Sequence, residues 1–138
     1  MPPRSAAAAT AALDDVRRIA VVGASSNHHR PSHGVMATLL RSGYEVVPVN
    51  PNADRVHGIE AVDRLADVEG PIDVVDVFRR REHAPEVAEA AAEVGAGVLW
   101  LQRGVISTRA REIAAAAGMG FVEDTCLGVE VVRARRAG

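Results

Sequence analysis

The first residues that could do chemistry form a short loop that begins with glycine. Gly23, Ala24 and Ser25 follow an apolar run, and Arg30-Pro31-Ser32 comes a few residues later. A glycine lets the backbone approach a ligand closely, and free N–H groups at the start of a helix attract anions. Arg30 would add a fork of donors and Ser32 a hydroxyl, so the loop is predicted to hold a phosphate or pyrophosphate.

This loop does not carry the complete dinucleotide-binding motif. Ser25 and His28 stand where the second and third glycines of GxGxxG would lie. An ordinary strand-to-helix turn, with Ser32 as the helix cap, is therefore an open alternative. Asn50-Pro51 ends the next strand, where NAD sites carry an acidic residue for the ribose. A neutral amide does not exclude a phosphorylated ribose, so the pattern favours a ligand with a phosphate on or near the ribose over NAD, unless these residues only shape a turn.

Three more positions are expected at strand ends. Phe78 would wall an adenine or a pantetheine arm or else pack in the core, and Arg79 would pair with phosphate. Arg80 and Arg81 are interpreted as a solvated helix entrance. Gln102 ends a further strand. The predicted binding set is therefore Gly23, Ala24, Ser25, Arg30, Pro31, Ser32, Asn50, Pro51, Phe78, Arg79 and Gln102.

The histidines and the cysteine indicate neither a metal site nor a catalytic constellation. His29 and His33 are spaced i, i+4, but they straddle a predicted loop and cap, and no acidic or Cys ligand accompanies them. Cys126 is the single cysteine. It is interpreted as a small buried thiol, with a mixed disulfide to the ligand as the alternative if it is exposed. No catalytic residue is assigned.

The elements that must position these residues alternate between β-branched runs and alanine-rich stretches, which is typical of βαβ units. We predict an α/β fold: a single domain with a Rossmann-like, doubly wound, parallel five-stranded sheet in the order 3-2-1-4-5. Its ligand would bind where the winding reverses, between Val22 and Leu101. The expected strands are 19–22, 45–49, 73–77, 98–101 and 121–122. The expected helices start at Ser32, Pro85 and Ser107, with a shorter one over 62–66.

Composition limits the function classes. The chain has 138 residues, of which 48% are hydrophobic and 25% charged, and its net charge is −2. The sign of the charge disfavours nucleic-acid binding. All 16 basic residues are Arg, which excludes lysine-based chemistry. The lone cysteine and the lack of a long apolar run predict a cytoplasmic protein outside the membrane. Residues 1–12 are expected to be a flexible tail and residues 13–138 the domain.

These motifs together resemble the small stand-alone CoA-binding domain proteins, whose fold is similar to the N-terminal domain of the succinyl-CoA synthetase alpha subunit. The resemblance runs from about Leu13 to Glu130. It implies a Rossmann-type sheet and a CoA ligand whose phosphates sit at the first loop, and it implies no particular reaction. The stretches that carry it are 19–25, 30–33, 43–51, 74–80, 100–102 with 104–105, and Asp124, Cys126 and Glu130.

The chain also departs from that family. Val62-Asp63-Arg64 replaces the usual Tyr, Pro and Ser, Arg103 replaces an apolar residue, and Thr125 replaces an Arg that could contact an anion. The leading hypothesis is a CoA or acyl-CoA binding protein. An NAD(P)-binding oxidoreductase or redox sensor on the same fold is the main alternative. An enzyme acting on CoA thioesters is a third, although no supported acid, base or nucleophile is visible.

Overall fold

The computed structural model describes residues 12–137. Nearly all of the tail predicted for residues 1–12 therefore lies outside the described residues. The strands are β1 (Arg18–Val22), β2 (Glu45–Val49), β3 (Arg55–Val56), β4 (Ile59–Glu60), β5 (Val74–Val77), β6 (Val98–Leu101) and β7 (Gly120–Val122). The α-helices are α2 (Pro31–Arg41), α3 (Ala84–Glu93), α4 (Thr108–Ala116) and α5 (Leu127–Ala137), and two 3-10 turns are η1 (Leu65–Asp67) and η2 (Arg81–His83).

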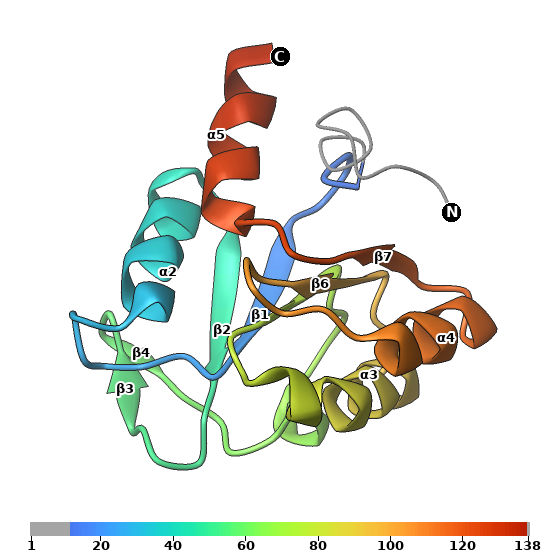
Figure 1. The fold of residues 1–138 in the computed structure, drawn as a ribbon. Coiled ribbons are helices and arrows are strands. Elements are labelled where there is room, and N and C mark those ends of the chain that lie inside the picture. The colour runs from blue at the N-terminus through green and yellow to red at the C-terminus, as the bar shows by residue number, and fades with distance from the viewer. Residues whose placement is uncertain (1–11, 138) are drawn as a thin grey trace.

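Five of these strands form one parallel sheet in the order β2-β1-β5-β6-β7 (Figure 1). Each of the five predicted strands is confirmed to within one residue at either end. The register places Val22 of β1 opposite Val49 of β2 and Val77 of β5, so the carboxyl ends of three strands meet. The prediction of a single α/β domain with a parallel five-stranded sheet is confirmed.

The predicted strand order is wrong. Numbered along the chain, the five strands lie in the order 2-1-3-4-5, not 3-2-1-4-5. The second strand is an edge strand and carries Pro48, which lacks an N–H and so could not pair on both sides. The third strand, β5, is buried at every residue and lies at the centre. The winding therefore reverses between Val22 and Val77, and the expected ligand position moves there from the Val22–Leu101 gap.

Helices cover both faces of the sheet and enclose two apolar cores (Figure 1). On one face, Val21, Val74 and Trp100 pack with residues of α2 and α5. On the other, Val75 and Leu101 pack with residues of α3 and α4. This alternation follows from the two-residue period of a strand that is buried on both sides. No helix within residues 12–137 is long and apolar enough to cross a membrane.

Two helix predictions need correction and two are confirmed. The helix expected to start at Pro85 is α3, which begins one residue earlier at Ala84. Arg30, not Ser32, is the N-cap of α2, and Ser32 lies buried inside its first turn. The helix predicted over 62–66 is absent, and only the 3-10 turn Leu65–Asp67 forms there. Ser107 caps α4 as predicted, since its Oγ accepts a hydrogen bond of 3.1 Å from the Ala110 N–H.

Two elements were not predicted from the sequence. The β3–β4 hairpin turns at His57 and Gly58, both of which have positive φ angles, 51° and 76°. Such a pair is typical of a type I′ turn, although Asn-Gly is its usual sequence. The helix α5 buries Leu127 and Val131, spaced i, i+4, against α2. The i, i+4 spacing of Leu127 and Val131 is the sequence feature from which α5 could be predicted.

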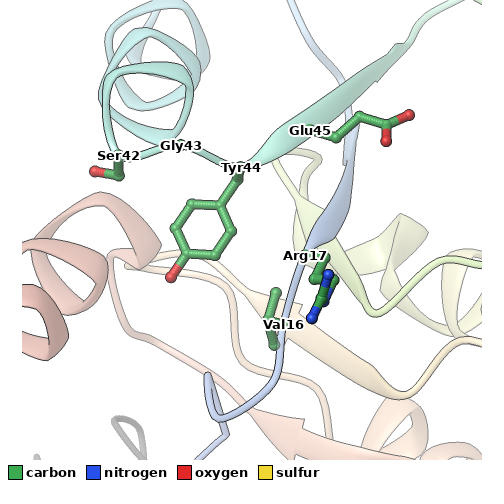
Figure 2. A pocket seen from close by; sticks show the side chains of 6 residues that line it. All are labelled: Val16, Arg17, Ser42, Gly43, Tyr44 and Glu45. Carbon is green, nitrogen blue, oxygen red and sulfur yellow. The ribbon is translucent and has the colours of Figure 1, made fainter. Parts of the chain in front are cut away.

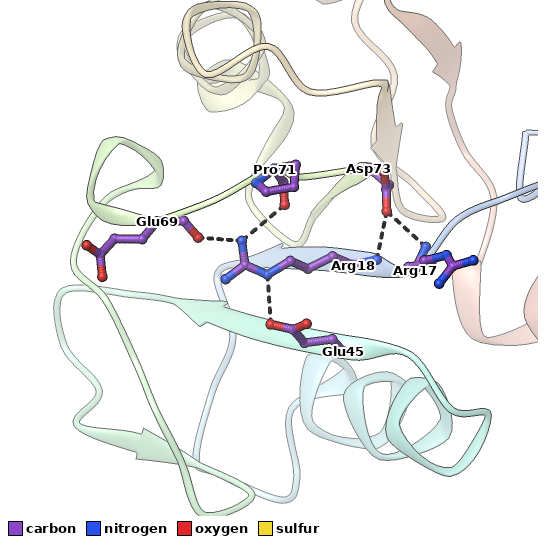
Figure 3. A network of polar contacts seen from close by, with 6 residues as sticks. All are labelled: Arg17, Arg18, Glu45, Glu69, Pro71 and Asp73. Carbon is purple, nitrogen blue, oxygen red and sulfur yellow. Dashed lines mark hydrogen bonds and ion pairs between the residues drawn. The ribbon is translucent and has the colours of Figure 1, made fainter.

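The amino ends of β1, β2 and β5 are joined by a polar network around Arg18 (Figure 3). Arg18 Nε donates to Glu45 Oε2 (2.8 Å), and Arg18 Nη1 donates to the carbonyls of Glu69 and Pro71. Asp73 Oδ2 accepts hydrogen bonds of 2.9 Å from the N–H groups of Arg17 and Arg18. Side chains of the domain itself therefore satisfy the polar groups at this edge of the sheet.

Candidate functional site

Gly23 opens the candidate site at the carboxyl end of β1. Its φ angle is 89°, and its N–H donates to the carbonyl of Val49 at 2.9 Å. A Cβ atom at this position would lie only 2.6 Å from the carbonyl oxygen of Phe78. Any side chain would therefore strain the backbone and collide with the chain that follows β5. The glycine lets the first loop turn tightly at the point where the winding of the sheet reverses.

The loop after Gly23 is ordered by its own polar groups. Ser25 Oγ accepts from the Asn27 N–H (3.0 Å), and Asn27 Oδ1 accepts from the His29 N–H (2.9 Å). Ala24 is buried, so only its backbone can face a ligand. Residues 26–30 are exposed. These local turns hold the loop in one conformation while leaving its outer side chains in solvent.

Arg30 and Pro31 lead the loop into α2. Arg30 has an extended backbone and no side-chain capping bond, and Pro31 occupies the first helical turn. No ion pair holds the Arg30 guanidinium within residues 12–137. An exposed guanidinium without a carboxylate partner is suited to a phosphate, which it can bind through two parallel hydrogen bonds.

Asn50 joins the end of β2 to the first loop. Its Nδ2 donates to the carbonyl of Ala24 at 2.7 Å, and its Oδ1 accepts from the Asn52 N–H at 2.9 Å. Pro51 between them is exposed. The amide therefore both shapes a turn and positions the loop. An aspartate in its place would lose the donor to Ala24, so the asparagine has a structural reason of its own.

Phe78 and Arg79 follow β5 on the other side of Gly23. Phe78 is partly buried and packs against the core beneath α2 and α5. Arg79 Nη1 lies 3.4 Å from Glu86 Oε1 at the start of α3, and both side chains are substantially exposed. An exposed pair at this distance contributes little stability, so Arg79 can exchange its partner for a phosphate at small cost.

Gln102 lies apart from these residues. It is buried, and its Oε1 accepts a hydrogen bond of 2.9 Å from the N–H of Leu127, the first residue of α5. Next to it, Asp124 Oδ1 accepts from the Gly104 N–H at 2.7 Å. Cys126, which directly precedes α5, is partly buried. The β6 end of the sheet is thus closed by the segment before α5, whereas the ends of β1, β2 and β5 carry most of the predicted residues.

Asp76 is a buried acid beside the site that was not singled out from the sequence. It lies one residue before the end of β5, opposite Val21 and Trp100, with no exposed surface. Neither carboxyl oxygen has a hydrogen-bond partner within the described chain. Burial raises the pKa of the Asp76 carboxyl well above its usual value, so the neutral acid is favoured. The sequence feature that indicates a buried Asp76 is its place within the otherwise apolar run Val74–Val77.

Two further features bear on where a ligand could lie. A surface hollow lined by Val16, Arg17, Ser42, Gly43, Tyr44 and Glu45 lies at the amino ends of β1 and β2, opposite the candidate site (Figure 2). Among residues 12–137, no group of three or more His, Cys, Asp or Glu side chains is placed to hold a metal ion. In parallel α/β sheets ligands bind at the carboxyl ends of strands, so the hollow is the less favoured location.

This sheet and its glycine-led loop define a small Rossmann-like α/β domain, and comparison with known proteins gives its family. Residues 17–132 match the family described as CoA binding domain. The chain is 42% identical over 117 residues to the uncharacterized protein YneT of Bacillus subtilis, covering 85% of this chain and 87% of that protein. The protein belongs to the CoA-binding domain family.

A solved structure shares this fold, and one region of a larger enzyme is similar in sequence. A hypothetical protein from Pyrococcus horikoshii superposes with a TM-score of 0.89 at 33% identity, covering 95% of this chain and 92% of that one. An ADP-forming acetate–CoA ligase of Methanocaldococcus jannaschii is 24% identical over 121 residues. That match covers 82% of this chain but only 17% of the ligase. The chain thus corresponds to one region of a much longer enzyme.

Proposed function

We propose that this protein binds CoA or an acyl-CoA at the carboxyl ends of β1, β2 and β5. The observation that carries the proposal is the position of the Gly23–Arg30 loop, at the reversal point of the sheet in a chain of the CoA-binding family. At Gly23 the Phe78 carbonyl leaves no room for a Cβ, so only glycine lets the first loop turn this close to the end of β5.

Several residues of the predicted set have a specific role in this proposal. Backbone N–H groups of the first loop and the Arg30 guanidinium would hold the phosphates of CoA. Asn50 would keep that loop in place through its bond to Ala24. Phe78 and Arg79 would line the side nearest β5, and Gln102 would act indirectly by fixing the start of α5. The remaining members of the set are Gly23, Ser25, Pro31, Ser32 and Pro51.

The proposal is for a binding protein, and no residue is assigned a catalytic role. CoA, when bound, supplies a thiol that carries acyl groups. The named activity of the archaeal relative, an ADP-forming acetate–CoA ligase, belongs to a protein of which this chain matches 17%. Its name nevertheless supports CoA as the ligand class, because the matched region covers most of this chain.

Calorimetric titration with CoA, acetyl-CoA, NAD and NADP tests the ligand class. We expect CoA and acetyl-CoA to bind and NAD to bind much more weakly, because Asn50 offers no carboxylate to the ribose hydroxyls. Tighter binding of NAD than of CoA would replace this proposal with the NAD(P)-binding alternative.

Replacing Arg30 tests the phosphate site. One charge-assisted contact to phosphate contributes about 1.5 to 3 kcal/mol. Arg30→Ala should therefore weaken CoA binding roughly ten- to a hundredfold, with a change in stability below about 0.5 kcal/mol. Arg109→Ala is the matched control, since Arg109 is an exposed arginine on α4 paired only loosely with Glu112 (3.5 Å). Parental CoA affinity in Arg30→Ala would contradict the proposed position of the phosphates.

A further inference from the structure

Four of the five histidines gather where the β3–β4 hairpin meets the start of α2. The rings of His33 and His57 are stacked, with centroids 3.9 Å apart and planes 29° from parallel. The rings of His28 and His29, in the first loop, lie 4.1 Å apart. His57 Nε2 is 2.7 Å from the carbonyl oxygen of His33. A carbonyl only accepts, so Nε2 carries the hydrogen and Nδ1 is left as an acceptor.

The hairpin turn is what brings His57 to this place. His57 has a φ angle of 51°, a conformation that costs most residues about 1 kcal/mol or more. The ring stack and the bond to the His33 carbonyl hold it there, and Figure 1 shows the hairpin beside the first turn of α2. Two segments more than twenty residues apart therefore place their imidazoles together at the first turn of α2, which follows Arg30 in the chain.

Charges of both signs lie around the cluster. Arg30 lies between His29 and α2, and the first turn of α2 has no acidic residue. The hairpin contributes Arg55 and, opposite it, Glu60, with Asp54 just before. Within residues 12–137, none of the four imidazoles forms an ion pair with a carboxylate. The carboxylates of Asp54 and Glu60 therefore lie near the cluster without pairing with its imidazoles.

Burial and the neighbouring imidazoles both affect the pKa of His33. Partial burial lowers the pKa of the His33 imidazole, and the charges of His57 and His28 lower it further. His33 therefore stays neutral at pH values where an isolated histidine would begin to charge. A bound dianion would offset that repulsion and favour the protonated rings.

We infer that His28, His29, His33 and His57, together with Arg30, form a proton-linked subsite for a phosphate group of the ligand. This inference rests on the proposed function for the identity of the ligand as CoA. Binding would be accompanied by proton uptake at the imidazoles, so affinity would rise as the pH falls. The subsite would make this protein a tighter CoA binder in mildly acidic than in alkaline solution.

The expected size of the pH dependence follows from the linkage between proton uptake and CoA binding. Uptake of one full proton changes the binding constant tenfold per pH unit, and partial uptake changes it less. The second pKa of a phosphate monoester lies near 6, so the range from pH 8 to pH 6.5 keeps the 3′-phosphate of CoA mainly dianionic. Across that range we expect the Kd for CoA to fall about three- to tenfold.

Calorimetry of the whole chain with CoA, in buffers of different ionisation enthalpy, measures the proton uptake directly. The double variant His33→Gln, His57→Asn should abolish most of it, and asparagine suits the positive φ at position 57. His83→Gln is the control, because His83 pairs with Glu86 (2.9 Å) outside the cluster. Dephospho-CoA, which lacks the 3′-phosphate, should lose the pH dependence if that phosphate occupies the subsite and keep it if the pyrophosphate does.

The wild-type chain gives a second measurement that needs no variant. Titration of the histidine ring signals by NMR, with and without inorganic pyrophosphate, should show higher pKa values for His33 and His57 when pyrophosphate is present. CoA binding without proton uptake and without these shifts would overturn the subsite and leave the proposed function standing. Shifts with pyrophosphate in a chain that does not bind CoA would support the phosphate subsite and overturn the proposed function. Retained pH dependence in the double variant would also count against the subsite.

Discussion

The two ends of the parallel sheet are built differently. At the amino ends, Arg18 and Asp73 join β1, β2 and β5 through side chains that are bonded within the domain (Figure 3). At the carboxyl ends of the same strands, Gly23 has no side chain, the loop side chains point into solvent, and Arg30 has no carboxylate partner in residues 12–137. One end thus uses its charges for stability, while the other keeps them available for a ligand.

The carboxyl edge of the sheet has two parts that are covered by different segments. The segment from Asp124 to Leu127 closes over β6 and is held by Gln102 and the Gly104 N–H. The first loop lies at the end of β1, where Asn50 at the end of β2 holds it. The reversal of the winding therefore coincides with the part of this edge that carries the predicted binding residues.

The largest effect we expect comes from filling the space at Gly23. Gly23→Ala would place a Cβ 2.6 Å from the Phe78 carbonyl oxygen at a φ angle of 89°. Overpacking and backbone strain together should destabilise the fold by about 3 to 5 kcal/mol, measured by urea unfolding. Gly43→Ala is the control, since Gly43 has a φ angle of 93° with no atom within 4 Å of its Cβ position. It should lose only about 1 to 2 kcal/mol. Equal losses of stability in the two variants would show that the close approach of Gly23 to the Phe78 carbonyl is unimportant.

Disrupting the polar network at the amino ends of the strands should lower the stability of the fold without changing CoA affinity. Asp73→Ala removes the acceptor of two backbone hydrogen bonds, from Arg17 and Arg18. A loss of about 2 to 3 kcal/mol is expected, because these bonds to a carboxylate are stronger than neutral ones and their donors lose a partner. CoA affinity, measured below the unfolding range, should stay within about twofold of the parent value. A large fall in affinity would mean that the two edges are not independent.

A smaller, pH-dependent effect is expected at Asp76. Burial raises the pKa of its carboxyl in the folded state, so the folded chain keeps a proton that the unfolded chain releases. As the pH rises above the unfolded value near 4, stability should fall by up to about 1.4 kcal/mol per pH unit until the folded pKa is passed. Asp76→Asn removes this slope and should be more stable than the parent at neutral pH. Parallel stability curves from pH 4 to 8 for the two proteins would rule out a neutral, buried Asp76.

The sequence was informative wherever a local pattern determines a local structure. The β-branched runs predicted the five strands, and Ser107 predicted its own helix start. Strand order was missed because short strands do not specify their neighbours, although Pro48 marked β2 as an edge strand. Arg30 replaced Ser32 as the cap because Pro31 already begins the helix, which leaves Ser32 inside. The contact between His33 and His57 depends on tertiary packing of the hairpin, which no local pattern reveals.

The central claim is that the ligand binds at the carboxyl edge and not at the hollow on the amino edge. Backbone amide NMR during titration with CoA tests this directly. We predict shifts for the non-proline residues of 23–33, 50–52, 57–58 and 78–79, and none for Val16, Arg17 or residues 42–45, which line the hollow in Figure 2. Shifts confined to the residues of that hollow would contradict the account.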